Sequence, residues 1–240
     1  MIRSDVDRYI SKTYHEALHY VKPDVIIFLG DLIDEGSVAG EQEFKDYVRR
    51  FYKIFNIKKN HDTIHHMFVP GDNDIGGEGW DRVTAEKVER FEWAFHAPIE
   101  DEEIFKFITF DRANVMPGAK SQLKHAQPQH RGENFKQSIK VLLSHIPLTD
   151  VHTPRGDAIM KEFEPNLVIS GHEHKSYFLR GGQQQAFENQ RGFVNLNIRD
   201  KTIEKEIVVP SCNYRLGNTG YGAAVISNLS NYTPETYALI

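Results

Sequence analysis

The fold is decided by the stretch Phe28-Leu29-Gly30-Asp31-Leu32-Ile33-Asp34-Glu35-Gly36, which follows the apolar run 25–28. A run of apolar and β-branched residues closed by glycine is typical of a buried parallel strand. Ligands of such sheets gather outside the carboxyl ends of the strands. The sequence therefore predicts that the carboxylate of Asp31 lies at a strand end where a binding site is expected.

Polar side chains follow apolar runs at three later places in the chain. Each of them alone could be an ordinary turn or a helix cap. Together, in this order and at the ends of apolar runs, they indicate a cluster of carboxylates and imidazoles, the composition of a metal site. The three stretches are Val69-Pro70-Gly71-Asp72-Asn73-Asp74, Leu142-Leu143-Ser144-His145 and Val168-Ile169-Ser170-Gly171-His172-Glu173-His174.

The bulk composition limits the possible partners. With 240 residues, the chain fits one domain over residues 1–240. Its 34 acidic residues outnumber its 29 basic ones and there is no basic run, so no nucleic-acid partner is expected. The sequence shows neither a secretory signal nor an apolar run of the roughly 20 residues that span a bilayer. Cys212 is the single cysteine, which excludes a thiolate zinc site within the chain. The oligomeric state cannot be read from the sequence.

Apolar periodicity predicts a mixed α/β protein. Helices are expected from residue 4 to about 22, over 41–55 and 84–95, and around 157–163. Strands are expected at 25–28, 63–69, 105–110, 141–145 and 167–170, an alternation that favours a parallel sheet. Residues 111–139 predict a long surface loop. Short runs at 177–179, 193–198, 207–210 and 223–227 suit a second, antiparallel sheet.

A mixed aspartate and histidine set fits a pair of divalent metal ions, since carboxylates and imidazoles together suit manganese, iron and zinc. Two such ions about 4 Å apart clamp a phosphate and generate hydroxide from water. In this interpretation Asp31 bridges both ions, and one ion is completed by Asp72, His145 and His172. His174 turns toward the other ion.

Two further carboxylates in the same motifs are less well placed to bind metal. Asp34 and Asp74 are predicted to orient the metal ligands by hydrogen bonding.

These motifs, in this order, resemble those of the calcineurin-like metallophosphoesterases. Four shorter sequence segments resemble the metallophosphoesterase 1 group of that family. These segments are 28–36, Val88-Glu89-Arg90-Phe91, Val209-Pro210-Ser211-Cys212-Asn213-Tyr214-Arg215 and Tyr232-Thr233-Pro234-Glu235-Thr236-Tyr237.

The resemblance implies a layered α/β/β/α sandwich and a metal-dependent phosphoric ester hydrolase that uses two divalent ions, Mn²⁺ or Zn²⁺. For the narrower group it implies a phosphodiesterase that removes ethanolamine phosphate from glycosylphosphatidylinositol (GPI) anchors. The partner would be a phosphorylated glycolipid or a GPI-anchored protein. The location would be the membrane of the endoplasmic reticulum or Golgi, with a lumenal active site.

The sequence departs from this family at two places. The family opens with a strand carrying Asp-x-His, which supplies two metal ligands, and nothing before Asp31 matches it, so the first strand is expected to be missing. Asp72 stands where the family usually has an asparagine, which keeps an oxygen ligand and adds negative charge. Asn73 stands where the family has a histidine that acts on the leaving group. An amide donates a hydrogen bond but does not deliver a proton near neutral pH.

The departures leave a second interpretation open. In it, the chain is a truncated, catalytically weakened domain that still binds metal or phosphate and acts through interaction. For either interpretation the surviving ligands predict one tightly bound ion, with a second ion bound weakly or not at all.

Overall fold

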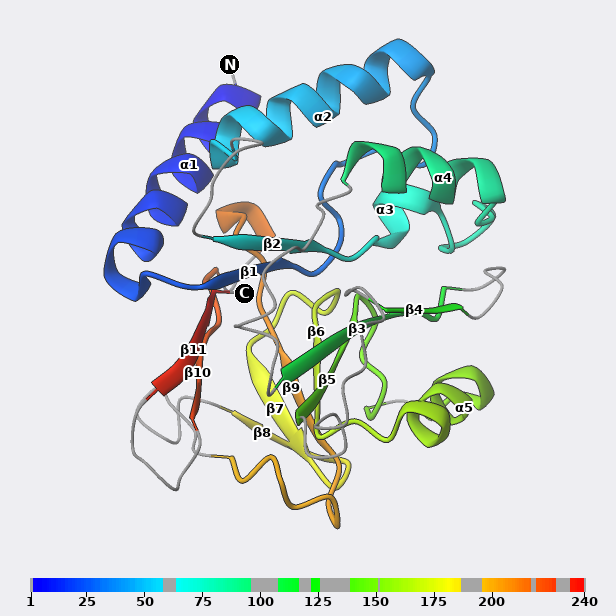
Figure 1. Cartoon of the computed structure of the whole chain (residues 1–240). Helices are drawn as coiled ribbons and strands as arrows, with labels where there is room; N and C mark the ends of the chain where they lie inside the picture. The colour runs from blue at the N-terminus through cyan, green and yellow to red at the C-terminus, as the bar shows by residue number, and fades with distance from the viewer. Residues whose placement is uncertain are drawn as a thin grey trace.

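Two β-sheets are stacked face to face, with helices on both outer sides, in the computed structural model (Figure 1). The structure describes residues 2–57, 64–95, 108–116, 122–125, 139–150, 152–186, 196–216, 219–227 and 234–239. This arrangement confirms the α/β sandwich that the sequence predicts.

The smaller sheet has four strands in the order β10-β11-β1-β2. Strand β1 (Val25–Phe28) lies parallel to β2 (His65–Phe68) along its whole length. On its other side β1 pairs in parallel with β11 (Pro234–Leu239), where Val25 and Ile26 of β1 are the paired residues in the described part of the chain. Strand β10 (Ala223–Ser227) runs antiparallel to β11 at the edge.

The larger sheet has seven strands in the order β4-β3-β5-β6-β9-β7-β8. Its four central strands run parallel, and β4, β7 and β8 are antiparallel additions at the two sides. The bounds are β3 Ile108–Asn114, β4 Gln122–His125, β5 Ile139–Ser144, β6 Leu167–Ser170, β7 Tyr177–Arg180, β8 Gln183–Ala186 and β9 Lys205–Val208.

Helices cover both outer faces (Figure 1). Helices α1 (Ile2–Val21), α2 (Glu41–Phe55) and α4 (Ala85–Ala94) pack on the small sheet, and α5 (Pro154–Phe163) packs on the large one. A short helix, α3 (Asp72–Ile75), follows β2. Among the described residues no helix is both long enough and apolar enough to cross a membrane.

Strand β1 is buried on both faces. Val25 and Ile27 point into the core between the sheets, whereas Ile26 and Phe28 contact the helices. Burial of one such side chain stabilises the fold by about 1.5–3 kcal/mol. The continuous apolar run before Asp31 is therefore explained by packing on two sides.

Several element predictions need correction. The run 207–210 and the run 177–179 do not form a separate antiparallel sheet, because β9 pairs in parallel with β6 and β7 pairs with β9. The predicted loop at 111–139 contains the end of β3 and the whole of β4. Residues 196–198 are not a strand, while 193–195 and 105–107 lie outside the described residues. Within the described part, helix α1 and no strand precedes β1.

Candidate metal centre

Asp31 lies where the chain leaves β1 and turns back. Its backbone has a left-handed φ of 53°, and Gly30 before it has a φ of 98°. A Cβ atom at Gly30 would lie only 2.3 Å from Nδ1 of His145. Glycine is therefore required both for the turn and for the close approach of the imidazole.

Asp72 is the first residue of the short helix α3, and its carboxylate lies beside Asp31. The backbone N–H of the next residue, Asn73, donates to Oδ1 of Asp31 over 3.1 Å. A Cβ atom at Gly71 would lie 2.2 Å from the backbone nitrogen of Asp31. The two motifs thus touch through backbone atoms, which fixes the separation of the two carboxylates.

His145 follows β5 and is 3% exposed. Its Nδ1 lies 2.6 Å from the carbonyl oxygen of Leu29, so Nδ1–H donates there and Nε2 carries the lone pair. Nε2 lies 3.0 Å from Oδ1 of Asp72 and 3.4 Å from Oδ1 of Asp31. The ring is therefore oriented with its lone pair toward the carboxylates.

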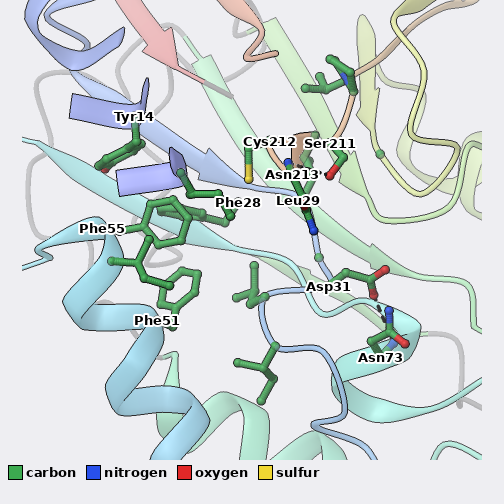
Figure 2. Close-up of a pocket in the computed structure, with 18 of the residues that line it drawn as sticks. Tyr14, Phe28, Leu29, Asp31, Phe51, Phe55, Asn73, Ser211, Cys212 and Asn213 are labelled. Carbon is green, nitrogen blue, oxygen red and sulfur yellow. Dashed lines mark hydrogen bonds between the residues drawn. The ribbon is translucent and has the colours of Figure 1, made fainter. Parts of the chain in front are cut away.

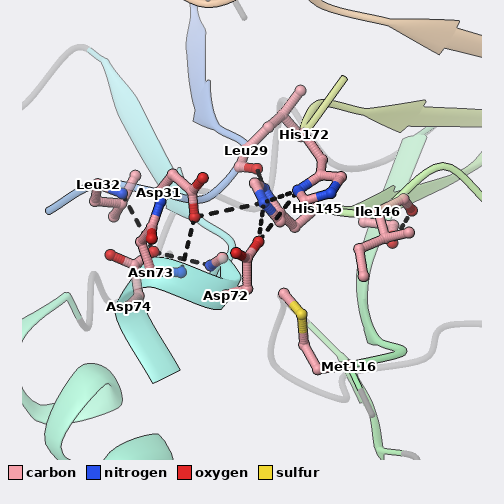
Figure 3. A network of polar contacts seen from close by, with 12 residues as sticks. Leu29, Asp31, Leu32, Asp72, Asn73, Asp74, Met116, His145, Ile146 and His172 are labelled. Atoms are coloured by element: carbon pink, nitrogen blue, oxygen red, sulfur yellow. Dashed lines mark hydrogen bonds and ion pairs between the residues drawn. The ribbon is translucent and has the colours of Figure 1, made fainter. Parts of the chain in front are cut away.

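His172 follows β6 in a turn with a left-handed φ of 66°. Its Nδ1 lies 3.1 Å from Oδ1 of Asp72 and 3.1 Å from Nε2 of His145 (Figure 3). Two carboxylates and two imidazoles, from four separate strand ends, thus meet around Asp72.

One ligand atom from each of these residues lies within 4.8 Å of all the others. Among the described residues, the group that could hold a metal ion consists of Asp31, Asp72, His145 and His172. The donor set of carboxylate oxygens and imidazole nitrogens fits a divalent first-row metal. We name these four residues the Asp/His cluster.

The residues of the Asp/His cluster shift one another's pKa values. The hydrogen bonds with His145 and then His172 hold the pKa of Asp72 well below its usual range. Burial alone would lower the pKa of His145, yet the hydrogen bond with Asp72 and the charge of Asp31 raise it. The hydrogen bond with Asp72 also raises the pKa of His172. A cation at this position is therefore favoured, whether it is a proton or a metal ion.

Asp74 is fully buried and joins the first two motifs. Its carboxylate accepts hydrogen bonds from the backbone of Gly71 (2.8 Å), Ile33 (3.1 Å) and Leu32 (3.2 Å). Burial raises the pKa of Asp74 to about 7 even though these N–H groups oppose the shift. The geometry suits the orienting role expected of Asp74.

Asp34 and His174 lie differently from the cluster residues. Asp34 is 65% exposed and forms an ion pair with Arg50 at 3.5 Å, away from the ligand atoms. His174, with a left-handed φ of 52°, lines the cavity at the cluster but is not among the four converging residues. The orienting role of Asp34 and the metal-ligand role of His174 stay predictions.

Glu206 is a residue that the sequence patterns did not single out. It is 0% exposed, on β9, and its carboxylate accepts hydrogen bonds from Leu148 N, Thr149 N, Thr149 Oγ1 and Ser170 Oγ at 2.7–3.1 Å. These donors lie just after His145 and just before His172. The signal in the sequence is a glutamate directly before an apolar run, which is unusual for a buried strand.

Comparison with known proteins agrees with this geometry. The calcineurin-like phosphoesterase family model matches residues 5–176. A metallophosphoesterase 1 of Ailuropoda melanoleuca is 34% identical over 220 residues, covering 70% of this chain and 54% of the relative. One of Danio rerio is 28% identical over 216 residues, covering 69% and 55%. The cell division control protein 1 of Saccharomyces cerevisiae is 26% identical over 257 residues, covering 98% and 51%.

The chain spans about half the length of these curated relatives. The matched region contains all four residues of the Asp/His cluster and every strand end that carries them. The chain belongs to the calcineurin-like phosphoesterase family.

Proposed function

We propose that this chain is a metal-dependent phosphoesterase whose reaction takes place at the Asp/His cluster. The observation that carries the proposal is the convergence of four ligand atoms, from four strand ends, within 4.8 Å of one another. A phosphoester at this edge of the sheets would be held at the carboxyl ends of parallel strands, where ligands of α/β folds bind.

The residues that would hold a divalent ion are Asp31, Asp72, His145 and His172. Such an ion supplies an electrophile for the phosphoryl oxygens and lowers the pKa of bound water. Mn²⁺ is our first candidate and Zn²⁺ our second, because imidazole and carboxylate ligands suit both. His174 is proposed as a ligand of a second, weaker ion because it lines the same cavity.

Asn73 is proposed as the group that acts on the leaving-group oxygen. Its side chain is exposed and lines the cavity next to Asp31 (Figure 2). The amide N–H₂ of asparagine donates a hydrogen bond that stabilises developing negative charge, but it transfers no proton. Substrates with good leaving groups should therefore react fastest.

The finer proposal concerns the substrate. We propose a phosphodiester of ethanolamine phosphate on a GPI-anchor glycan, cleaved in the lumen of the early secretory pathway. Its support is the resemblance to the metallophosphoesterase 1 group and the relatives of that name. We also propose that residues 1–240 act as one domain, because both sheets contribute ligands to one cluster.

A second candidate function is a weakened domain that binds metal or phosphate without efficient turnover. Asn73 in place of a proton donor favours it, and so does the position of His174 outside the four converging residues. The loss of a general acid typically costs about 10²- to 10⁴-fold in rate.

The test is hydrolysis by the purified chain with Mn²⁺ or Zn²⁺ added. Bis(p-nitrophenyl) phosphate, with its good leaving group, reports general activity, and a GPI glycan bearing ethanolamine phosphate reports the finer substrate. Asp72→Ala should abolish metal-stimulated hydrolysis. His152→Ala is the matched control, because His152 is exposed and pairs with Asp157 on the surface.

Metal-stimulated turnover that needs Asp72 supports the enzyme. Metal binding to the wild type with no turnover of either substrate supports the weakened domain. Activity that survives in Asp72→Ala would contradict the placement of the reaction at this cluster.

A further inference from the structure

The segment Val88-Glu89-Arg90-Phe91 of helix α4 contributes no residue to the Asp/His cluster, yet Arg90 reaches the chain just after the first motif. Its Nη1 donates to the carbonyl oxygen of Ala39 over 2.9 Å, and its Nη2 donates to that of Gly36 over 2.5 Å. A guanidinium presents its N–H donors in a fixed fork, so one side chain can bind two acceptors at once. Arg90 therefore holds both ends of the segment 36–39.

The other contacts of Arg90 indicate that these two hydrogen bonds are its role. The central carbon of the guanidinium lies 4.3 Å from the centroid of the Phe44 ring on α2. Among the described residues, its buried Nε has no hydrogen-bond partner. A buried donor without a partner is unfavourable, so an arginine would be a poor residue for packing alone.

The segment 36–39 lies directly against the second motif. The backbone N–H of Ser37 donates to the carbonyl oxygen of Asn73 over 2.8 Å. A Cβ atom at Gly36 would lie 3.3 Å from the same oxygen, which is a tight contact. A displacement of this segment would therefore move the backbone of Asn73.

Asn73 depends on such outside contacts because helix α3 is short. The helix has four residues, Asp72–Ile75, and ends at Gly76 with a φ of 87°. A single helical turn is not stable by itself. The N–H of Asn73 donates to Oδ1 of Asp31 over 3.1 Å (Figure 3), and its carbonyl oxygen accepts from Ser37. These two contacts hold the backbone on both sides of the exposed Asn73 side chain.

We propose that Arg90 is a positioning residue for Asn73. Through the segment 36–39, it fixes the backbone from which the amide of Asn73 reaches the leaving-group oxygen of a bound phosphoester. This inference rests on the proposed function, in which Asn73 stabilises the leaving group, and adds the residue that sets its direction.

The first measurement needs no turnover. Arg90→Met keeps the length of the side chain and removes its donors. Hydrogen exchange of the full chain, followed by NMR, should show that the protection of the Ser37 N–H falls at least about tenfold, because the segment opens more often. The N–H of Gly71 donates to Asp74 over 2.8 Å in the same region and should keep its protection within about twofold. Unchanged protection at Ser37, or an equal fall at Gly71, would overturn the inference.

The second measurement is kcat with Mn²⁺ on aryl methyl phosphodiesters whose leaving groups range from p-nitrophenol to phenol. Arg90→Met should lower kcat about tenfold for phenol and about twofold or less for p-nitrophenol, because a poor leaving group depends most on the amide. KM and the Kd of Mn²⁺ should stay within about threefold. A loss of Mn²⁺ affinity as large as the loss of kcat would show that Arg90 supports the whole site, which contradicts the proposal.

A double variant tests whether Arg90 acts through Asn73. Asn73→Ala should show the same dependence on the leaving group, and adding Arg90→Met should lower kcat by less than about twofold further. Losses that multiply would refute the proposal. Arg49→Met is the matched control, because Arg49 has a 69% exposed side chain that pairs with Asp46 on α2, and it should change none of these values.

Arg90→Lys keeps the charge but lacks the fork, and it applies even where Arg90→Met does not fold. A lysine can bind one of the two carbonyl oxygens, so Ser37 protection and kcat for phenol should each fall about threefold. Wild-type values in both measurements would count against the need for two hydrogen bonds and overturn the inference.

The outcome is separable from that of the proposed function. If bis(p-nitrophenyl) phosphate is hydrolysed while Arg90→Met leaves Ser37 protected, the function stands and this inference fails. If Ser37 loses protection in Arg90→Met and the wild type hydrolyses no phosphoester, the positioning of Asn73 by Arg90 stands and the proposed function fails.

Discussion

Replacement of Glu206 by leucine removes the acceptor on which two loops of the metal centre depend. The carboxylate accepts from the backbone N–H groups of Leu148 and Thr149 and from the hydroxyl groups of Thr149 and Ser170. Leucine has a similar size but accepts nothing, so these donors lose their partner in a place closed to water.

The expected cost follows from the number of donors. Each buried donor left without a partner costs about 1–3 kcal/mol, and the two backbone N–H groups cannot turn to another acceptor. Removal of the buried negative charge offsets part of this cost. We therefore expect Glu206→Leu to lower the free energy of unfolding by about 4 kcal/mol. Glu206→Gln, which keeps one acceptor oxygen, should lower it by about 2 kcal/mol.

The assay is urea unfolding of the metal-free chain, followed by circular dichroism. With an m value of about 2–3 kcal/mol/M, the midpoint of Glu206→Leu should fall by about 1.5 M. Because the loops carry His145 and His172, Mn²⁺ affinity should fall as well, which calorimetry measures at low urea.

Glu204 is the matched control, two residues away and exposed. Glu204→Leu should change stability by no more than about 0.5 kcal/mol. Equal midpoints for the Glu204 and Glu206 variants would refute the reasoning, and so would unchanged metal affinity in Glu206→Gln.

Three further predictions concern the site. After dialysis the chain should retain one equivalent of metal; Asp72→Ala should abolish this tight site and His174→Ala should change it little, because His174 is outside the converging four. Two retained equivalents in an elemental analysis would contradict this. Asn73→His should raise kcat about 10²-fold or more on substrates with poor leaving groups and much less on p-nitrophenyl esters. Equal gains on both kinds of substrate would count against a proton-donor role for the side chain at this position. Burial raises the pKa of Cys212 to about 11. The neutral thiol is therefore favoured in the folded state, and this contribution to stability is lost as pH rises toward 11. Because the thiolate is the reacting form, alkylation of Cys212 should accelerate about tenfold per pH unit from pH 8 to 10. A rate that reaches a plateau by pH 9 would contradict this prediction.

Local patterns were sufficient to place the strand ends. The apolar run before Asp31 and the runs before Asp72, His145 and His172 each form a strand or lead directly from one. Parallel strands present their carboxyl ends at one edge, so the sequence predicts that the four side chains meet. The helices at 41–55 and 84–95 were likewise predictable, because their apolar spacing reflects one buried face.

Local patterns could not decide which of the two carboxylates, Asp34 or Asp74, is buried. Both follow a glycine and an aspartate in the sequence, yet Asp74 is enclosed by three backbone N–H groups and Asp34 pairs with Arg50 at the surface. Which of them is buried depends on the contact between the first and second motifs, some 40 residues apart. No local window contains that contact.

The sequence by itself determined the alternation of the longer helices and strands up to β3, the two-sided burial of β1 and the residue types gathered at the strand ends, because these follow from periodicity and turn chemistry within short windows. Only the tertiary structure decided which sheet each C-terminal strand joins, that Glu206 holds the loops after His145 and before His172, and which side chain of α4 holds the segment 36–39. The reason is that strand pairing and contacts between loops depend on hydrogen bonds and packing between segments that are far apart in the chain.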